Sequence, residues 1–195
     1  MRESTLKHYE KLNGLAQQEG IVIFGCGEDT NIPTGELRQA FSVEENLYNR
    51  SLDRISIQDA PGVYEEIVAP LAPETVMLHF GETDKSLFAE NASAFDHMYR
   101  KLIAKIKSYN KKCRIALVSL KNYDNDPQTD EMNRHIKYIA DSEQCEYGDI
   151  ATPKVWNPKA TMDVSSFLSS IGFVRPQQYK RPLYDLVKIL FCYEA

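Results

Sequence analysis

The sequence lacks the features that mark several large classes of protein. It has no run approaching the roughly 20 apolar residues of a membrane-spanning helix and no G-x-G-x-x-G or Walker phosphate loop. The formal net charge is -5 and no basic stripe stands out, so we expect neither nucleic acid nor a membrane as a partner. Residues 1–18 are charged and resemble no signal peptide or lipidation motif, which predicts a cytoplasmic protein.

Cysteine is scarce and scattered. The four cysteines lie far apart, at positions 26, 113, 145 and 192, without the spacing of a metal site. In a reducing cytoplasm they are predicted to be free thiols, mostly small apolar fillers. We expect no cofactor and no metal ion.

What is present is the composition of an ordinary globular protein. The chain has 195 residues, of which 43% are hydrophobic and 26% charged. This length suits one domain, residues 1–195, with a full core. Helical patterns are expected near 5–18, where Leu6, Tyr9, Leu12 and Leu15 have helical spacing, and near 37–41, 61–71, 86–109, 130–142 and 182–191. The proline-containing stretch 152–181 is expected to be largely irregular.

Apolar runs alternate with these helical patterns along the chain. Such alternation predicts right-handed βαβ crossovers and a parallel sheet covered by helices on both faces. The expected fold class is α/β, a three-layer α/β/α sandwich with flavodoxin-like order and about five parallel strands. The strands are expected near residues 21–24, 46–49, 75–80, 114–120 and 145–150.

Two of these runs end at a glycine that opens a polar loop. One is Ile21-Val22-Ile23-Phe24-Gly25-Cys26-Gly27-Glu28-Asp29-Thr30, and the other is Thr75-Val76-Met77-Leu78-His79-Phe80-Gly81-Glu82-Thr83-Asp84. Sheets of this class place their sites at the carboxyl ends of their strands. The candidate site is therefore expected at these two loops, with a positive φ at Gly27.

The order and spacing of these blocks resemble the SGNH (GDSL) hydrolase family. Phe24-Gly25 matches the start of its first block, F-G-D-S-x-T, with Cys26 at the Asp position and Gly27 at the nucleophilic Ser position. Tyr48-Asn49-Arg50-Ser51-Leu52-Asp53 is similar to the second block, and Gly81-Glu82-Thr83-Asp84 to the third, G-x-N-D. The resemblance runs from about residue 20 to residue 150.

The departures from the family fall at its catalytic positions. The resemblance implies a Ser nucleophile, Gly and Asn oxyanion donors, and a D-x-x-H pair near the C-terminus. Here Gly27 has no side chain, and Thr83 stands in place of Asn. Asp163 and Ser166 give the best D-x-x-H match, with Ser in place of His, and no histidine follows His135. A Ser nucleophile needs a base and preorganised donors, and the sequence lacks both at the expected places.

Two hypotheses of function follow. In the first, the chain is a pseudoenzyme that acts as a binding or scaffolding protein for a small molecule or another protein. In the second, it is an esterase with a different active site, in which Cys26 is the nucleophile beside His79 on the neighbouring strand. Oligomeric state stays open. The binding cleft is expected to comprise Cys26, Gly27, Glu28, Asn49, Arg50, Gly81, Thr83 and Asp84.

Four carboxylates follow the two strands. Glu28, Asp29, Glu82 and Asp84 could form an acidic rim that binds a hard cation, although such residues more often cap helices, as Asp84 could for the helix that follows. Arg50 is expected to pair with Asp84 or Glu82 across the cleft.

Overall fold

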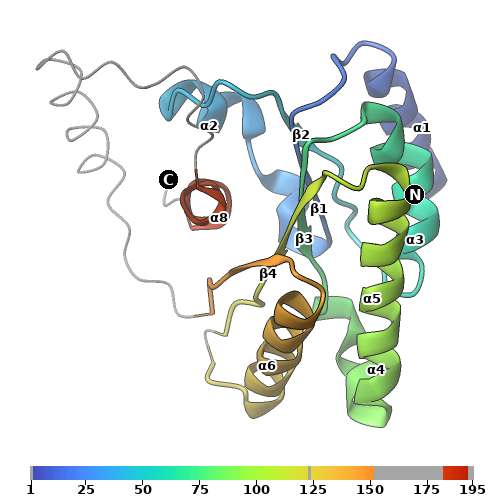
Figure 1. The fold of residues 1–195 in the computed structure, drawn as a ribbon, viewed down its shortest axis with the longest axis vertical. Helices are drawn as coiled ribbons and strands as arrows, with labels where there is room; N and C mark the ends of the chain where they lie inside the picture. The colour runs from blue at the N-terminus through green and yellow to red at the C-terminus, as the bar shows by residue number, and fades with distance from the viewer. Residues whose placement is uncertain (1, 123, 152–181, 193–195) are drawn as a thin grey trace, which may run out of the picture.

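A computed structural model describes residues 2–122, 124–151 and 182–192 of the chain, and it contains a five-stranded parallel sheet (Figure 1). The strand order is β2-β1-β3-β4-β5, and every neighbouring pair is parallel. The expected α/β/α sandwich is therefore confirmed. The strands are β1 (Ile21–Gly25), β2 (Leu47–Asn49), β3 (Thr75–His79), β4 (Arg114–Val118) and β5 (Glu146–Gly148).

The central strands are continuous apolar runs because both faces of the sheet are covered. All five residues of β1 and all five of β3 are buried. The two strands pair in register from Ile21 opposite Thr75 to Gly25 opposite His79. The loops that follow β1 and β3 therefore leave the sheet side by side, at its carboxyl edge.

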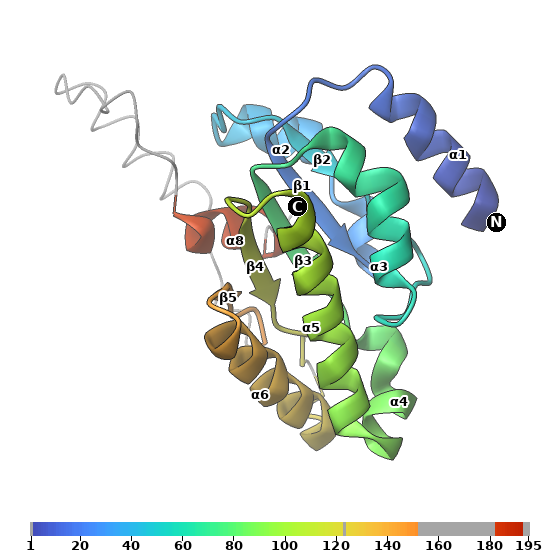
Figure 2. The same cartoon turned by 45° about the vertical axis from the view of Figure 1, so that its right-hand side comes forward.

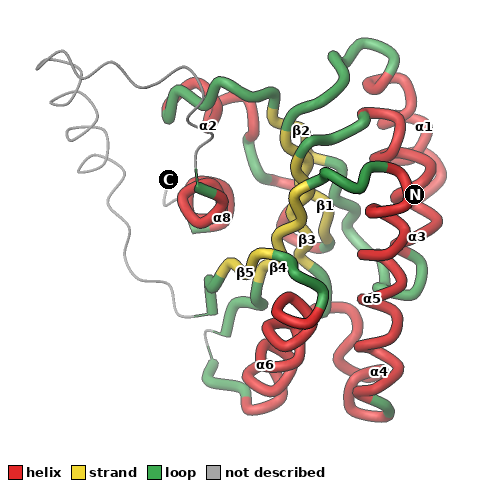
Figure 3. The backbone as a smooth tube through the Cα atoms, in the orientation of Figure 1, coloured by secondary structure: helices red, strands yellow, loops and turns green. Residues whose placement is uncertain are grey.

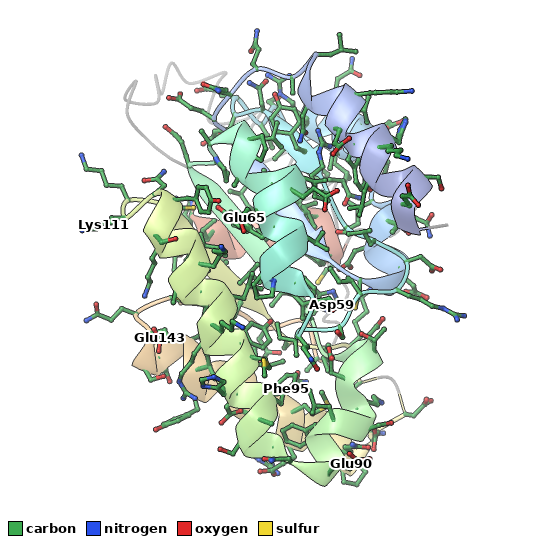
Figure 4. All side chains as sticks on the ribbon, turned by 90° about the vertical axis from the view of Figure 1, so that its right-hand side faces the viewer. Asp59, Glu65, Glu90, Phe95, Lys111 and Glu143 are labelled. Carbon is green, nitrogen blue, oxygen red and sulfur yellow. The ribbon has the colours of Figure 1, made fainter. Side chains whose placement is uncertain are left out.

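Most helices cover one face of the sheet; they stand on the right and at the bottom of Figure 1 and in front in Figure 2. These elements bury Val22, Phe24 and Phe95 in one cluster, and Figure 4 views this layer directly with Phe95 labelled. The elements are α1 (Arg2–Asn13), α3 (Ala60–Val63), the π-helical turn η2 (Tyr64–Val68), the 3₁₀ turn η3 (Ala69–Leu71), α4 (Lys85–Glu90), α5 (Ala92–Tyr109) and α6 (Pro127–Ser142).

Two helices, α2 (Thr34–Ala40) and α8 (Leu183–Phe191), lie on the opposite face, as the tube in Figure 3 shows. They pack on the alternate side chains of the same strands, among them Ile21, Ile23 and Met77, in a second cluster. Two short 3₁₀ helices, η1 (Gly27–Asn31) and η4 (Glu82–Asp84), begin at the carboxyl ends of β1 and β3. These two turns carry most of the candidate site.

The structure corrects three of the expected helices. The helix expected over 5–18 ends at Asn13, and Leu15 lies beyond it and is 85% exposed, so Leu15 does not continue the apolar face of the helix. The helix expected over 86–109 is interrupted at Asn91, whose side chain accepts a hydrogen bond from the N–H of Ala94 and caps α5. The helix expected over 61–71 consists of three short helical segments, and Pro70 in the last one has no N–H for an α-helical bond.

No helix in the described ranges is both long enough and apolar enough to cross a membrane.

Candidate functional site

The turn after β1 is built around Gly27. Its φ is +66°, as the sequence predicts, in the left-handed region that favours glycine. The N–H of Gly27 donates to the carbonyl oxygens of Leu52 and Asp53, each at 3.2 Å. The end of β1 is thereby joined to the loop after β2, and the backbone N–H of the nucleophile position is already used within the protein.

The carboxylate of Glu82 lies directly against Gly27. A Cβ atom placed on Gly27 would stand 2.6 Å from Oε2 of Glu82, closer than real Cβ contacts come. Because Glu82 is exposed, its side chain has room to move away. In the conformation observed, however, an anionic group occupies the space where the side chain of a nucleophile would begin.

The two residues after Glu82 turn their polar groups toward the loop 55–57. Thr83, which the sequence resemblance aligns with an oxyanion Asn, donates its hydroxyl to the carbonyl oxygen of Ile55 at 2.8 Å. Asp84 is 2% exposed and accepts the N–H of Ile57 on both carboxylate oxygens, at 3.1 and 3.2 Å. Burial raises the pKa of Asp84, against the effect of this hydrogen bond. Asp84 precedes α4 but makes no side-chain cap there, contrary to the suggested capping role.

Cys26 is buried in the first core cluster. Its exposed fraction is 1%, and it packs on the same side of the sheet as Val22 and Phe24. Burial raises the pKa of the thiol to about 12, and the negative charge of Glu82 adds to the effect. At neutral pH the thiolate, which is the nucleophilic form, is essentially absent.

His79 lies on the other face of the sheet and is paired with Asp29. Its Nδ1 stands 2.8 and 2.9 Å from the two carboxylate oxygens of Asp29, and both side chains are buried. Asp29 reaches His79 because η1 folds back over Gly25, where an added Cβ would be blocked by the same carboxylate. The ring of Phe191 from α8 packs edge-on against the imidazole at 5.3 Å. Within the described residues, Nε2 of His79 is buried without a hydrogen-bond partner.

The structure does not bring Cys26 and His79 together, although they come from neighbouring strands. His79 is the register partner of Gly25, and side chains alternate between the two faces along a strand. Cys26, one residue further on, therefore points into the cluster with Phe24, while His79 packs against Phe191. The proposed Cys/His arrangement is wrong in its geometry.

The residues after β2 are also placed differently from the expectation. Arg50 is buried and donates from Nε and a terminal nitrogen to Oδ1 of Asn13, at 2.9 and 2.8 Å. Its guanidinium lies over the ring of Tyr9, so the expected pairing with Asp84 or Glu82 is wrong. Asn49 faces the site and donates its amide to the carbonyl oxygen of Asp29 at 2.6 Å.

The four carboxylates do not converge on one point. Asp29 and Asp84 are buried and bonded in different directions, whereas Glu28 and Glu82 are exposed. Nowhere in the described ranges do three or more His, Cys, Asp or Glu residues stand close enough to hold a metal ion. Gly81 begins η4 with a φ of +135°. Asp163 and Ser166 lie outside the described residues.

A second feature of this edge was not predicted from the sequence. A hollow of about 290 Å³ lies between η1, α8 and the residue that follows Leu120. It is lined by Glu28, Asp29, Asn31, Ile32, Lys121, Leu190 and Phe191. The position of Lys121 just beyond the fourth strand was an available signal, because the carboxyl ends of parallel strands share one edge. The contribution of α8 could not be foreseen, since nothing in its sequence says where on the sheet it packs.

Comparison with known proteins gives matches in structure only. No protein-family model and no curated protein matches the sequence. A Streptococcus pneumonia protein whose name refers to platelet activating factor superposes with a TM-score of 0.64 at 14% identity, covering 87% of this chain and 91% of the other. A GDSL-like lipase from Bacteroides thetaiotaomicron gives 0.55 at 16% identity, covering 87% and 98%.

An acetylxylan esterase from Geobacillus stearothermophilus superposes with a TM-score of 0.52 at 16% identity, covering 84% of this chain and 99% of that one. Identities this low carry information about the fold and not about the chemistry. The strand order, the glycine turn after β1 and these superpositions together show that the chain has the fold of the SGNH/GDSL hydrolases.

Proposed function

We propose that this chain has lost the Ser-His-Asp esterase chemistry associated with its fold and acts as a binding protein. The observation that carries the proposal is the carboxylate of Glu82 against Gly27, where the side chain of a nucleophile would begin. The ligand is a small molecule or a protein segment that contacts the carboxyl edge of the sheet.

Electrostatics at this position disfavour acyl transfer. Attack on an ester places negative charge on the carbonyl oxygen, and enzymes stabilise that charge with donors aimed at it. Two donors of this region are committed, since the N–H of Gly27 is bonded to Leu52 and Asp53 and the hydroxyl of Thr83 to Ile55. An oxyanion formed near Gly27 would meet the carboxylate of Glu82, which repels it.

The alternative, an esterase that uses Cys26, has less support. A nucleophilic cysteine needs a depressed pKa and access to substrate. Cys26 has a pKa raised to about 12, is 1% exposed, and faces away from His79. The structural neighbours named as lipase and esterase share the architecture with this chain. In our proposal this chain keeps the shared fold but uses it to bind a ligand.

The test is hydrolysis of p-nitrophenyl acetate by the purified protein, with Cys26→Ala and Gly27→Ser measured beside it. We expect the parent and Cys26→Ala to release p-nitrophenol at the rate of an equal concentration of a non-enzymatic protein. Gly27→Ser is expected to stay at that rate too, because Glu82 remains beside the new hydroxyl and His79 lies on the opposite face.

The controls separate the two hypotheses. Turnover by the parent that disappears in Cys26→Ala would establish a thiol enzyme and overturn the proposal. Turnover that persists in both would also overturn it, and would place an active site elsewhere in the chain. Circular dichroism of each variant ensures that a missing activity is not a missing fold.

A further inference from the structure

The hollow between η1 and α8 combines features that the Gly27 turn lacks. It lies on the face of the sheet covered by α2 and α8, which stand together on the left of Figure 1. Its volume, about 290 Å³, is near the lower end of the roughly 300–1,000 Å³ found for ligand pockets. A small metabolite fits this space, whereas a dinucleotide or a folded protein segment does not.

Of the four polar side chains that line the hollow, Asp29 is bonded to His79, and the other three have no bonds to the described parts of the chain. Glu28 and Lys121 carry opposite charges and both line the hollow, yet no ion pair joins them. Asn31 stands beside them, and among residues 2–122, 124–151 and 182–192 none of the three has a hydrogen-bond or ion-pair partner. One cation, one anion and one amide thus remain available to a ligand.

Three residues of the lining are apolar and buried in the core. Ile32, Leu190 and Phe191 are each at most 9% exposed and belong to the second core cluster. The ring of Phe191 also packs edge-on against the imidazole of His79, and that imidazole is hydrogen-bonded to Asp29. The apolar floor is therefore preformed, and a ligand's apolar part would be buried there without reordering the core.

We propose that this hollow binds a free α-amino acid with an apolar side chain. Lys121 would donate hydrogen bonds to the ligand's carboxylate, and Glu28 would accept hydrogen bonds from the ligand's ammonium group. The amide of Asn31 can donate to the carboxylate or accept from the ammonium group. The side chain would lie on Ile32, Leu190 and Phe191. The inference rests on the proposed binding function and names the ligand's chemical class.

The charge pattern argues against simpler ligands. A carboxylate without an ammonium group would pair with Lys121 but would be repelled by Glu28. An amine without a carboxylate would pair with Glu28 but would be repelled by Lys121. A zwitterion such as an α-amino acid satisfies the two side chains at once.

The experiment uses three isosteric probes, L-leucine, 4-methylpentanoate and 3-methylbutylamine, titrated into the full chain by isothermal calorimetry and ligand-observed NMR. We expect L-leucine to bind, and each single-charge analogue to bind about tenfold or more weakly, as the loss of a charge-assisted contact implies. If either analogue equals L-leucine, or if L-leucine does not bind, the proposal is wrong.

Two variants assign the charges. Lys121→Met should weaken binding of L-leucine and 4-methylpentanoate but not of the amine, and Glu28→Gln should weaken L-leucine and the amine but not the carboxylate. The matched controls are Lys137→Met on α6 and Glu90→Gln on α4, whose position is labelled in Figure 4. Equal losses in the control variants would overturn the assignment.

The esterase assay is independent of these titrations. A chain that neither hydrolyses p-nitrophenyl acetate nor binds L-leucine would overturn this inference and leave the loss of ester chemistry standing. A chain that hydrolyses the ester would overturn the proposed function, whatever it binds.

Discussion

Gly27 and Glu28 are neighbours in the chain, yet they face two regions of opposite character. Around Gly27 three polar groups are bonded within the protein: the Gly27 N–H, the Thr83 hydroxyl and the Asp84 carboxylate all have backbone partners. In the hollow, the side chains of Glu28, Asn31 and Lys121 have no hydrogen-bond or ion-pair partners in the described part of the chain. Polar groups at the Gly27 turn thus serve the fold, whereas three side chains of the neighbouring hollow are free to meet a ligand.

The difference shows how the two regions contribute to stability and to binding. A buried polar group stabilises the fold only when it is bonded, and removing its partner costs about 1–3 kcal/mol. An exposed group without partners adds almost nothing to stability, so its removal costs little. Substitutions at the Gly27 turn should therefore cost more stability than substitutions in the hollow.

The largest expected effect is on the reactivity of Cys26. With a pKa of about 12, the fraction of thiolate at pH 8 is about 10⁻⁴, roughly 10³-fold less than for an exposed thiol of pKa about 8.5. Iodoacetamide should label Cys26 correspondingly slowly in the native protein, and the rate should rise about tenfold per pH unit as long as the protein stays folded. Peptide mass spectrometry measures the rate.

The control for this measurement is the same protein unfolded in urea, in which Cys26 should react like any free thiol. If native Cys26 were labelled as fast as Cys26 in the unfolded chain, the thiol would be accessible and reactive. The contrast between the Gly27 region and the hollow would then be wrong.

The next largest effect is on the free energy of unfolding of Asp29→Ala. The substitution leaves the buried imidazole of His79 without its only partner in the described residues, and we expect a loss of about 3 kcal/mol. Urea denaturation followed by circular dichroism measures the loss. The matched variant Asp53→Ala, at an exposed position, should change stability by no more than about 0.5 kcal/mol. Equal stabilities for the two variants would show that the buried pair contributes nothing.

A smaller loss is expected for Gly27→Ala. The left-handed backbone costs an L-residue about 1–2 kcal/mol, and the new Cβ must also displace the carboxylate of Glu82. Gly35→Ala on α2, where an added Cβ meets nothing within 4 Å, should instead stabilise the protein by about 0.5–1 kcal/mol.

The double variant Gly27→Ala/Glu82→Ala divides the cost at Gly27 into its two parts. Because the carboxylate is then absent, any loss that remains reports the backbone strain alone. A Gly27→Ala protein as stable as the parent would be inconsistent with the positive φ.

The smallest effect is expected in the hollow. Lys121→Met and Glu28→Gln should each change the free energy of unfolding by no more than about 0.5 kcal/mol, because neither side chain has a bonding partner in the described chain. Thermal and urea denaturation measure both. If either variant lost more than about 1 kcal/mol of its free energy of unfolding, the side chain would stabilise the fold. The hollow would then not differ from the Gly27 region in this respect.

Much of the fold was predictable because the strands are strongly patterned. Continuous apolar runs that end at Gly25 and Gly81 indicated buried parallel strands, and the strand order brought their loops together. The positive φ at Gly27 was predictable too, from a glycine at a strand end. The strands and the glycine turn depend on residue types at consecutive positions, and these can be read directly from the sequence.

The side-chain directions in the loops were less predictable. Arg50 turns to Asn13 in α1, and Asp29 folds back over Gly25, because each follows a local turn whose path the residue types do not determine. The helix near 86–109 was interrupted by a capping asparagine inside an otherwise regular apolar pattern. The closed state of the Gly27 region could be inferred in part from the missing Ser and His. The carboxylate of Glu82 that fills it could not.

If the chain has lost its ester chemistry, no side chain near Gly27 attacks an ester. Peptide mass spectrometry after brief exposure of the native protein to p-nitrophenyl acetate tests this claim, because covalent catalysis forms an acyl-enzyme. We predict no acetyl group on Cys26 or on any Ser or Thr residue, and only the slow lysine acetylation that unfolded protein also shows. Rapid acetylation of one Cys, Ser or Thr in the native protein, absent after unfolding, would contradict the account.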